Sequence, residues 1–223
     1  MPIAKDQEAG ACRRCPTTAI PRHYSIVAMS ALGFALFSTS IGPCGIAWNA
    51  RGVAAVQLPE RDETATRARL LRRCPEAHEA EPPEHIRQAI DSIAALLGGE
   101  HRDLSGIALD MAGVPPFQQR VYTIARGIPA GSTLSYGEIA ERLGDKTAAR
   151  DVGEAMGQNP FPIIVPCHRV LGAGGKLGGF SAHGGITTKL RLLEIEGAQV
   201  GTAPTLFGSL PLTAPRRRHA PNR

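Results

Sequence analysis

The sequence predicts an α+β protein built in two parts, and two observations carry that prediction. In residues 33–58, short apolar runs alternate with glycine and proline, which is typical of a small antiparallel sheet. Farther along the chain, apolar side chains recur at helical spacing, and glycine or proline separates the runs. We therefore expect an N-terminal α/β domain over residues 24–112 and a predominantly helical domain over residues 113–200. The flanking residues 1–23 and 201–223 are expected to be a disordered segment and a basic flexible tail.

The N-terminal part should contain a strand meander and two helices. Ile86, Ile90 and Ile93 recur at helical spacing, and Gly98 is a suitable stop for that helix. Pro75 ends an earlier helix, because proline cannot continue the helical hydrogen bonds. The expected strands are residues 33–39, 46–49, 53–58 and 107–111, and the expected helices are residues 64–73 and 86–97.

The second part should open with a helix over residues 117–126 and continue into a helix-turn-helix. Ser135 and Glu138 have the spacing of a capping box, which would open the first helix of the pair. Thr147 is expected to cap the second helix, which would run to about Gln158. Such a pair either contacts DNA or only packs in a core, and the small side chains of the second helix suit both.

The formal net charge of +5 permits nucleic-acid binding without pointing to it. Most of the excess lies in residues 201–223, which contain arginines and no acid. Those arginines are Arg216, Arg217, Arg218 and Arg223. We expect this tail to be solvated rather than to be a DNA contact.

The chain has five cysteines, an odd number, and no recognisable secretory signal. This pattern argues against a disulfide framework and favours a reducing compartment. The most apolar stretch, residues 26–37, is too short to cross a bilayer. We therefore expect a cytoplasmic protein without membrane contact.

Cys167 is the residue most suited to chemistry, because His168 follows it directly. Residues 163–165 are predicted to form a short buried strand that delivers this pair. A free thiol has a pKa of about 8.5, so a base must help to form the thiolate at neutral pH. His168 could be that base, and Glu194 is a candidate to hold its imidazole. The alternative is an inert buried cysteine beside a histidine by chance.

The second part contains several short stretches whose order and spacing match the pattern of a known family. They are Phe117-Gln118-Gln119, Ser135-Tyr136-Gly137, residues 148–153, Asn159-Pro160, residues 163–170, Gly179-Phe180-Ser181 and residues 189–194. Together they resemble the C-terminal domain of O6-alkylguanine-DNA alkyltransferases, and Pro-Cys-His-Arg-Val at residues 166–170 is a highly specific marker of that family. The N-terminal half resembles the family more loosely. The resemblance implies a small α/β domain of ribonuclease-H-like type followed by a winged-helix-like domain for catalysis and DNA binding.

The resemblance also implies a role for each matched residue in the reaction. Cys167 would accept the alkyl group, with a water, His168 and Glu194 generating its thiolate. Asn159 would brace the turn that shapes the site, and Tyr136 would help to protonate the departing guanine. The reaction would transfer methyl or another alkyl group from O6 of guanine, and from O4 of thymine, once per protein molecule. No cofactor or metal is implied.

DNA recognition follows from the same resemblance. The protein would flip the damaged nucleotide out through the minor groove, and Arg150 would fill the vacated stack. The small side chain of Ala149 would allow a close approach to the DNA, and Tyr136 would also contact the DNA. Groups near Val170 and Ser181 would read the edge of the base. The expected partner is double-stranded DNA containing O6-alkylguanine, bound by a monomer.

One departure from the family pattern, one candidate metal site and two alternative functions remain at this point. Phe180 stands where many relatives have tyrosine, and Cys12 and Cys15 have a spacing that suits zinc without a second pair to match. One alternative function is non-catalytic binding of alkylated DNA, as in alkyltransferase-like proteins, which lack a cysteine at the position of Cys167. The other is a Cys-His hydrolase completed by Glu194, although no oxyanion-loop motif is recognisable.

Overall fold

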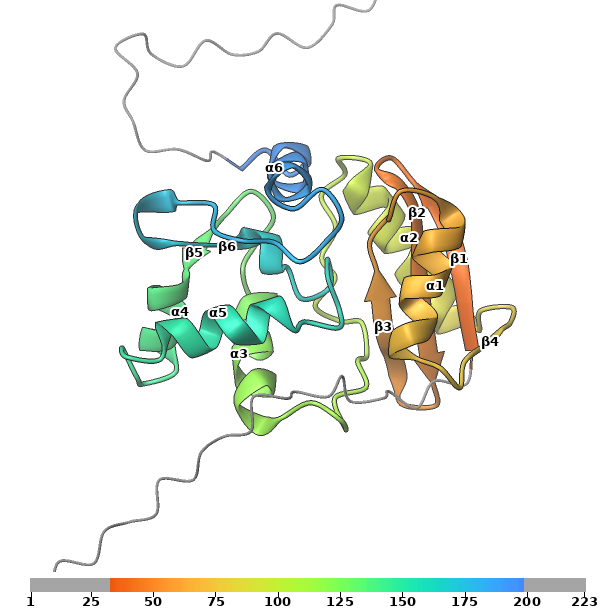
Figure 1. Cartoon of the computed structure of the whole chain (residues 1–223), viewed down its shortest axis with the longest axis horizontal. Helices are drawn as coiled ribbons and strands as arrows, with labels where there is room; N and C mark the ends of the chain where they lie inside the picture. The colour runs from red at the N-terminus through yellow and green to blue at the C-terminus, as the bar shows by residue number, and fades with distance from the viewer. Residues whose placement is uncertain (1–32, 199–223) are drawn as a thin grey trace, which may run out of the picture.

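The computed structural model describes residues 33–198, which form a mixed α+β fold with a sheet at one side and a group of helices at the other (Figure 1). The expected terminal segments, and residues 24–32 of the expected N-terminal domain, lie outside the described residues. No helix within residues 33–198 is long and apolar enough to cross a membrane.

The sheet has four strands in the order β3-β2-β1-β4. They are β1 (Gly33–Thr39), β2 (Gly42–Asn49), β3 (Gly52–Gln57) and β4 (His78–Glu79). The first three form an antiparallel meander, and β4 pairs parallel to β1. Glycine is required at the second turn, since Gly52 has a φ of 133° and an added Cβ would lie 2.4 Å from the carbonyl oxygen of Ala108.

The three strands of the predicted meander are confirmed, but β2 begins four residues earlier than expected. Pro43 can take part because it pairs with Ser38 of β1, while β3 pairs with β2 only from Gly45 onward. The missing N–H of Pro43 therefore faces a side without a partner strand. The strand expected at residues 107–111 is wrong, since this segment makes a single parallel bridge between Leu109 and Val53.

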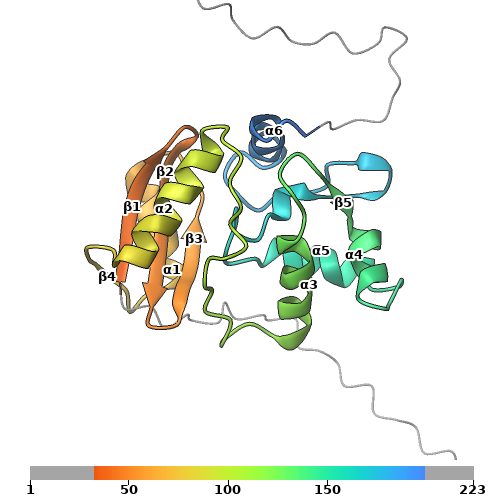
Figure 2. The same cartoon turned by 180° about the vertical axis from the view of Figure 1, so that it is seen from behind.

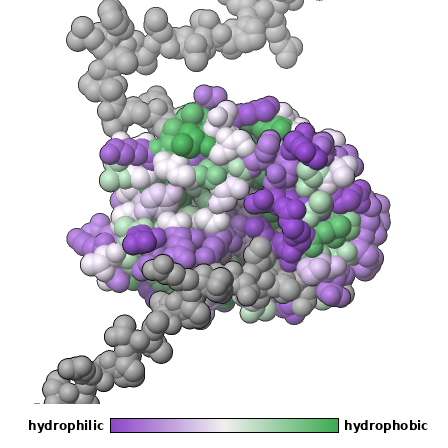
Figure 3. All heavy atoms as spheres, in the orientation of Figure 1, coloured by the Kyte–Doolittle hydropathy of each residue, from purple (hydrophilic) through white to green (hydrophobic). Residues whose placement is uncertain are grey.

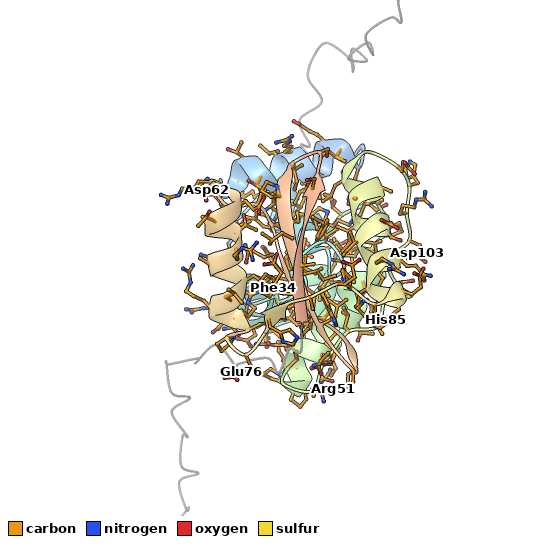
Figure 4. The ribbon with its side chains drawn as sticks, turned by 90° about the vertical axis from the view of Figure 1, so that its right-hand side faces the viewer. Phe34, Arg51, Asp62, Glu76, His85 and Asp103 are labelled. Carbon is orange, nitrogen blue, oxygen red and sulfur yellow. The ribbon has the colours of Figure 1, made fainter. Side chains whose placement is uncertain are left out.

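Helices α1 (Glu63–Arg73) and α2 (Glu84–Leu97) cover opposite faces of the sheet. Helix α1 lies in front of the sheet in Figure 1 and α2 in front of it in Figure 2, and the side view in Figure 4 places the strands between them. Asp62 caps α1 by accepting a hydrogen bond from the backbone N–H of Ala65 at 2.7 Å. The bounds of both helices agree with the predicted bounds to within two residues.

The second part, as far as Ala198, contains four α-helices, two short 3-10 turns and one two-stranded parallel ladder. The helices are α3 (Pro116–Arg126), α4 (Tyr136–Arg142), α5 (Ala149–Gly157) and α6 (Ile186–Ile195), and the strands are β5 (Leu134–Ser135) and β6 (Val170–Leu171). The predicted helix pair is confirmed as α4 and α5, and Ser135 and Glu138 form the capping box. The predicted cap of α5 is wrong. Thr147 donates to Asp145 at 2.6 Å, and the N-cap residue is Ala148, whose side chain cannot cap.

The strand expected at residues 163–165 is also wrong, because this segment is a tight buried turn. Ile163 has a φ of 74°, which no strand residue adopts, and the Val165 N–H donates to the carbonyl of Phe161 at 2.8 Å. Pro162 cannot donate to a ladder, so the β-branched run folds back on itself instead. All three residues of the run remain buried as predicted.

One continuous hydrophobic core links the two parts, with residues of β1–β3 and α1–α2 in the same cluster as those of α3–α5. A backbone hydrogen bond of 2.8 Å from Val56 of β3 to Pro160 joins the sheet to the turn before Cys167. The turn that carries the predicted reactive cysteine therefore lies against the edge strand of the sheet.

Candidate active site

Cys167 begins one turn of 3-10 helix (Cys167–Arg169) directly after the buried turn. Only 8% of the residue is exposed, and it lines a pocket of about 430 Å³. One wall of this pocket comes from the second part, through Tyr136, Met156 and Phe180. The opposite wall comes from β3 and α1. Cys167 is thus almost buried in the wall of a shaped cavity.

Asn159 fixes the turn that holds Cys167 in place. Its side-chain amide donates to the carbonyl of Val165 at 2.8 Å, and its side-chain oxygen accepts from the N–H of Phe161 at 2.9 Å. Burial raises the pKa of the Cys167 thiol, whereas a hydrogen bond with Asn159 and the charge of Lys189 lower it. Burial is the largest of these effects, so the thiol is protonated at neutral pH and needs a base.

The predicted partner of His168 is wrong, because the carboxylate that holds the imidazole belongs to Glu196 and not to Glu194. His168 Nε2 lies 2.9 Å from Glu196 Oε1, and Arg169 donates to both oxygens of the same carboxylate at 2.8 Å. All three side chains are buried, whereas Glu194 is exposed. An exposed carboxylate on the outer face of α6 cannot orient a buried ring.

A periodicity signal could have identified Glu196. Leu192 and Leu193 face the core, and Glu196 follows them by four and three positions, which puts it on the same helix face. Glu194 comes directly after them and points away. Arg169 is a second signal, since a buried arginine requires an acid.

The protonation states in this cluster follow from burial and from its hydrogen bonds. Burial lowers the pKa of His168 more than Glu196 raises it, so the imidazole is neutral at physiological pH. Burial opposes ionisation of Glu196, but hydrogen bonds from His168 and Arg169 hold its pKa at about 2. Because the ionised carboxylate accepts from Nε2–H, Nδ1 of His168 carries the lone pair. Within the described part of the chain, Nδ1 has no hydrogen-bond partner.

Tyr136 and Lys189 lie close to the reactive thiol. The Tyr136 ring lines the pocket beside Gly153, whose added Cβ would lie 3.9 Å from the ring. Burial raises the pKa of Tyr136, and the charge of Cys167 raises it further. Lys189, which the sequence analysis did not single out for the site, is fully buried. Its Nζ donates to the carbonyl of Val170 at 2.6 Å and lies 6.0 Å from the centre of the Tyr136 ring.

The remaining predicted residues fall into two groups. Ser181 lines the pocket and donates to the carbonyl of Gly157 at 3.0 Å, and Val170 is buried beside Cys167. Ala149 and Arg150 lie in the first turn of α5 and do not line the pocket. Arg150 is exposed. Ala149 and Arg150, which are expected to contact DNA, therefore lie apart from the pocket, whereas Tyr136, which has both expected roles, lines it.

A metal is not held by any cluster in the described residues. Within residues 33–198, no group of three or more histidine, cysteine or acidic side chains could bind a metal ion. Cys12 and Cys15 lie outside the described residues. Cys44 and Cys74 are buried free thiols of the N-terminal part, and burial raises the pKa of Cys44 to about 12 and that of Cys74 to about 11.

Residues 116–198 match the family described as the DNA-binding domain of 6-O-methylguanine DNA methyltransferase. A methylated-DNA–protein-cysteine methyltransferase of Mycobacterium leprae is 50% identical over 120 residues, which are 54% of this chain and 70% of that protein. The chain belongs to the methylated-DNA–protein-cysteine methyltransferase family. The family member of Methanothermobacter thermautotrophicus is 36% identical over 156 residues, or 70% of this chain and 80% of that one.

Solved structures of this methyltransferase family are similar to about three quarters of the chain. The Mycobacterium tuberculosis OGT structure in complex with DNA is 38% identical, with a TM-score of 0.59 over 74% of this chain and 93% of that chain. The O6-methylguanine-DNA methyltransferase of Pyrococcus kodakaraensis is 28% identical, with a TM-score of 0.58 over 74% and 99%. The structural similarity therefore extends beyond residues 116–198, which the family model matches.

Proposed function

We propose that this methyltransferase-family chain repairs DNA by moving a methyl or other alkyl group from O6 of guanine, and from O4 of thymine, onto Cys167. One observation carries the proposal: a buried cysteine lines a pocket of about 430 Å³, next to a histidine whose ring is held by an ionised carboxylate. An inert core cysteine would need neither the pocket nor the carboxylate. The type of reaction is inferred from membership of the methylated-DNA–protein-cysteine methyltransferase family.

The thiolate is generated by His168. The neutral imidazole carries its proton on Nε2, which donates a hydrogen bond to Glu196. Nδ1 is therefore the basic atom, and it takes the Cys167 proton through one water. The ionised Glu196 stabilises the imidazolium that forms. The Lys189 ammonium opposes the effect of burial on the thiol and favours the thiolate. Each of these groups is buried, which strengthens its electrostatic contribution.

The thiolate then displaces guanine from the alkyl carbon. The Sγ–C bond forms as the C–O6 bond breaks, and the electron pair stays on O6 of the base. The phenol of Tyr136 donates a hydrogen bond or proton to the departing guanine, which otherwise leaves as an anion. Burial and the Cys167 charge raise the pKa of Tyr136, so the phenol keeps its proton until then. The thioether product is stable, so each molecule reacts once.

The nucleotide must leave the duplex to reach Cys167, at an unstacking cost of about a few kcal/mol. Arg150 in the first turn of α5 is exposed and fills the vacated stack. The small residue Ala149 lets α5 approach the minor groove closely. Main-chain groups at Val170 and Ser181 read the base edge. The partner is double-stranded DNA containing O6-alkylguanine, and the protein acts as a monomer.

We further propose that the two parts correspond to the family's domains. The sheet with α1 and α2 is the ribonuclease-H-like α/β domain, and the helices from α3 onward form the winged-helix-like domain with the boundary near residue 113. The helix pair α4–α5 and the adjoining β5–β6 ladder support the second assignment.

Mass spectrometry tests the proposed function. After incubation with duplex DNA containing O6-methylguanine, the peptide that contains Cys167 should gain one methyl group. The Cys167→Ala variant should gain none and still bind the lesion, because binding depends on the pocket and α5. An intact wild-type protein of unchanged mass after excess substrate would overturn the proposal.

A further inference from the structure

A second cavity of about 500 Å³ is lined by the connection between α2 and α3, the C-terminal end of α3 and the turn before Cys167. It shares no lining residue with the Cys167 pocket. In Figure 2 the connection runs in front, between the sheet and the helices of the second part. Figure 3 shows the other face, where hydrophilic side chains gather over α1, a wall of the Cys167 pocket. An alkylated base in the Cys167 pocket therefore does not occupy the second cavity.

Three arginines line the second cavity, and they differ in how their charges are compensated. Arg102 forms an ion pair with Glu100 at 2.8 Å, and Arg169 forms one with Glu196 at 2.8 Å. Arg126 is half-buried and forms no ion pair with any residue from 33 to 198. Because an arginine stays protonated, Arg126 brings an uncompensated positive charge to the wall of the cavity.

The hydrogen bonds of Arg126 satisfy only part of its guanidinium. Its Nη2 donates to the carbonyls of Leu104, Ser105 and Ile107. Its Nε is buried without a hydrogen-bond partner in the described part of the chain, and Nη1 makes no hydrogen bond there either. Burial lowers the pKa of Arg126. A partly buried cation with unused donors is costly, and a bound anion would reduce that cost.

Asp103 is the acid nearest to this role, but it is held elsewhere. Its carboxylate also lines the second cavity, and its charge acts on Arg126. Its two oxygens accept from the backbone N–H of Ser105 at 2.8 Å and from the Ser105 hydroxyl at 2.9 Å. It is exposed and does not approach Arg126 within ion-pair distance. The guanidinium of Arg126 therefore stays available to an anion from outside the protein.

The rest of the lining indicates the chemistry of such an anion. Leu104, Ile128, Ile163 and Ile164 are buried and border the cavity with apolar surface. A matching ligand therefore has an apolar body as well as a charged end. One uncompensated guanidinium matches one negative charge, since the other two arginines already have carboxylate partners. A phosphate dianion would bring a second charge without a cation to meet it.

We infer that the second cavity binds a small organic carboxylate, with its charged end on Arg126 and its apolar body against Ile163 and Ile164. Hydrogen bonds from a guanidinium to a carboxylate are charge-assisted and are stronger than those between neutral groups. The apolar body adds to the affinity because it leaves water for the isoleucine side chains. The inference does not rest on the proposed function, because the cavity is separate from the Cys167 pocket.

Titration of the wild-type protein with 2-naphthoate tests the inference, with the NMR signals of the isoleucine methyl groups as the readout. Binding should have a dissociation constant of about 1 mM or below and should shift the signals of Ile128, Ile163 and Ile164. The neutral isostere 2-naphthamide should bind about 10- to 100-fold more weakly, because the charge-assisted hydrogen bond is lost. Inorganic phosphate should not shift these signals. Equal binding of naphthoate and naphthamide would overturn the inference, as would naphthoate shifts confined to the Cys167 pocket, for example at the Met156 methyl group.

Two variants assign the binding to Arg126. Arg126→Gln should weaken naphthoate binding by about 10- to 100-fold and leave naphthamide binding unchanged, and Arg126→Lys should restore part of the loss. Arg120→Gln is the matched control, because Arg120 is exposed on the same helix and lines neither cavity. It should leave the binding of both compounds unchanged. Unchanged naphthoate binding in Arg126→Gln would overturn the inference. If that variant does not fold, since it loses the bonds to three carbonyls, the comparison of the two compounds on the wild-type protein decides.

Discussion

His168 Nε2 lies 2.9 Å from Glu196 Oε1 across 28 residues of sequence, in a cluster that Arg169 closes from the other side. The arrangement sets the tautomer of the imidazole, because an ionised acceptor on Nε2 leaves Nδ1 as the base. It also joins the C-terminal end of α6 to the 3-10 turn that begins with Cys167. Catalysis and stability are therefore coupled in one set of hydrogen bonds.

Glu196→Gln should slow alkyl transfer by about 100-fold, because a neutral amide stabilises the imidazolium less and can invert the tautomer. It should also destabilise the fold by about 3–5 kcal/mol, since Arg169 loses its buried partner. Single-turnover rates and urea unfolding measure the two effects. Glu194→Gln, two residues away and exposed, is the control and should change neither. The opposite result would restore Glu194 as the residue that orients His168.

The ionisation of Glu196 should determine how the stability of the fold depends on pH in acid. Its pKa is held at about 2 in the folded protein, below the ordinary value of 4.5, so the folded state binds fewer protons than the unfolded state in acid. The stabilisation is complete above about pH 5 and is lost as the pH falls toward 2, and it amounts to about 3 kcal/mol. Unfolding midpoints between about pH 6 and 3 should fall steeply in the wild-type protein and less so in Glu196→Gln. If the unfolding midpoints of the two proteins fell in parallel as the pH decreased, the stabilisation could not be assigned to the ionised Glu196.

Asn159→Ala should both loosen the active-site turn and slow the reaction. The variant leaves the buried N–H of Phe161 without its acceptor, and the carbonyl of Val165 keeps only its hydrogen bond from the N–H of Cys167, so the loss should be about 1–3 kcal/mol. It also removes a hydrogen bond that favours the Cys167 thiolate, so the pH–rate profile should shift to higher pH. A loss of stability with an unchanged profile would limit Asn159 to a structural role.

Local sequence signals predicted the strands of the meander, the long helices and the capping box, because each depends on neighbours a few residues apart. The failures have non-local causes. Residues 163–165 form a turn because Asn159 and the flanking prolines override the β propensity of the run. The choice between Glu194 and Glu196 depended on which face of α6 meets Arg169, a contact made 27 residues away. The sequence analysis did not predict that Arg73 lines the pocket, because only the packing of α1 against the second part brings this residue there.

The helix pair offers a test of capping with an internal control. Ser135→Ala should destabilise the protein by about 1 kcal/mol, because the backbone N–H of Glu138 loses its acceptor at the start of α4. Thr147→Ala should cost less, since Thr147 bonds to Asp145 and does not cap α5. Thermal unfolding of the two variants measures the difference. A larger loss in Thr147→Ala would return the capping role to that residue.

Arg150→Ala should separate base flipping from chemistry. Arg150 is exposed at the start of α5 and does not line the pocket, so its loss should not alter the thiol, His168 or Glu196. Transfer from duplex O6-methylguanine should slow by about 10-fold or more, because the vacated stack is no longer filled. Transfer from the free base O6-benzylguanine should keep its rate, since no stack has to be opened. Arg87→Ala removes the same charge from α2 of the N-terminal part, at a residue that does not line the pocket, and should affect neither substrate. If Arg150→Ala slowed both substrates equally, the residue would act on the pocket itself and not on the DNA.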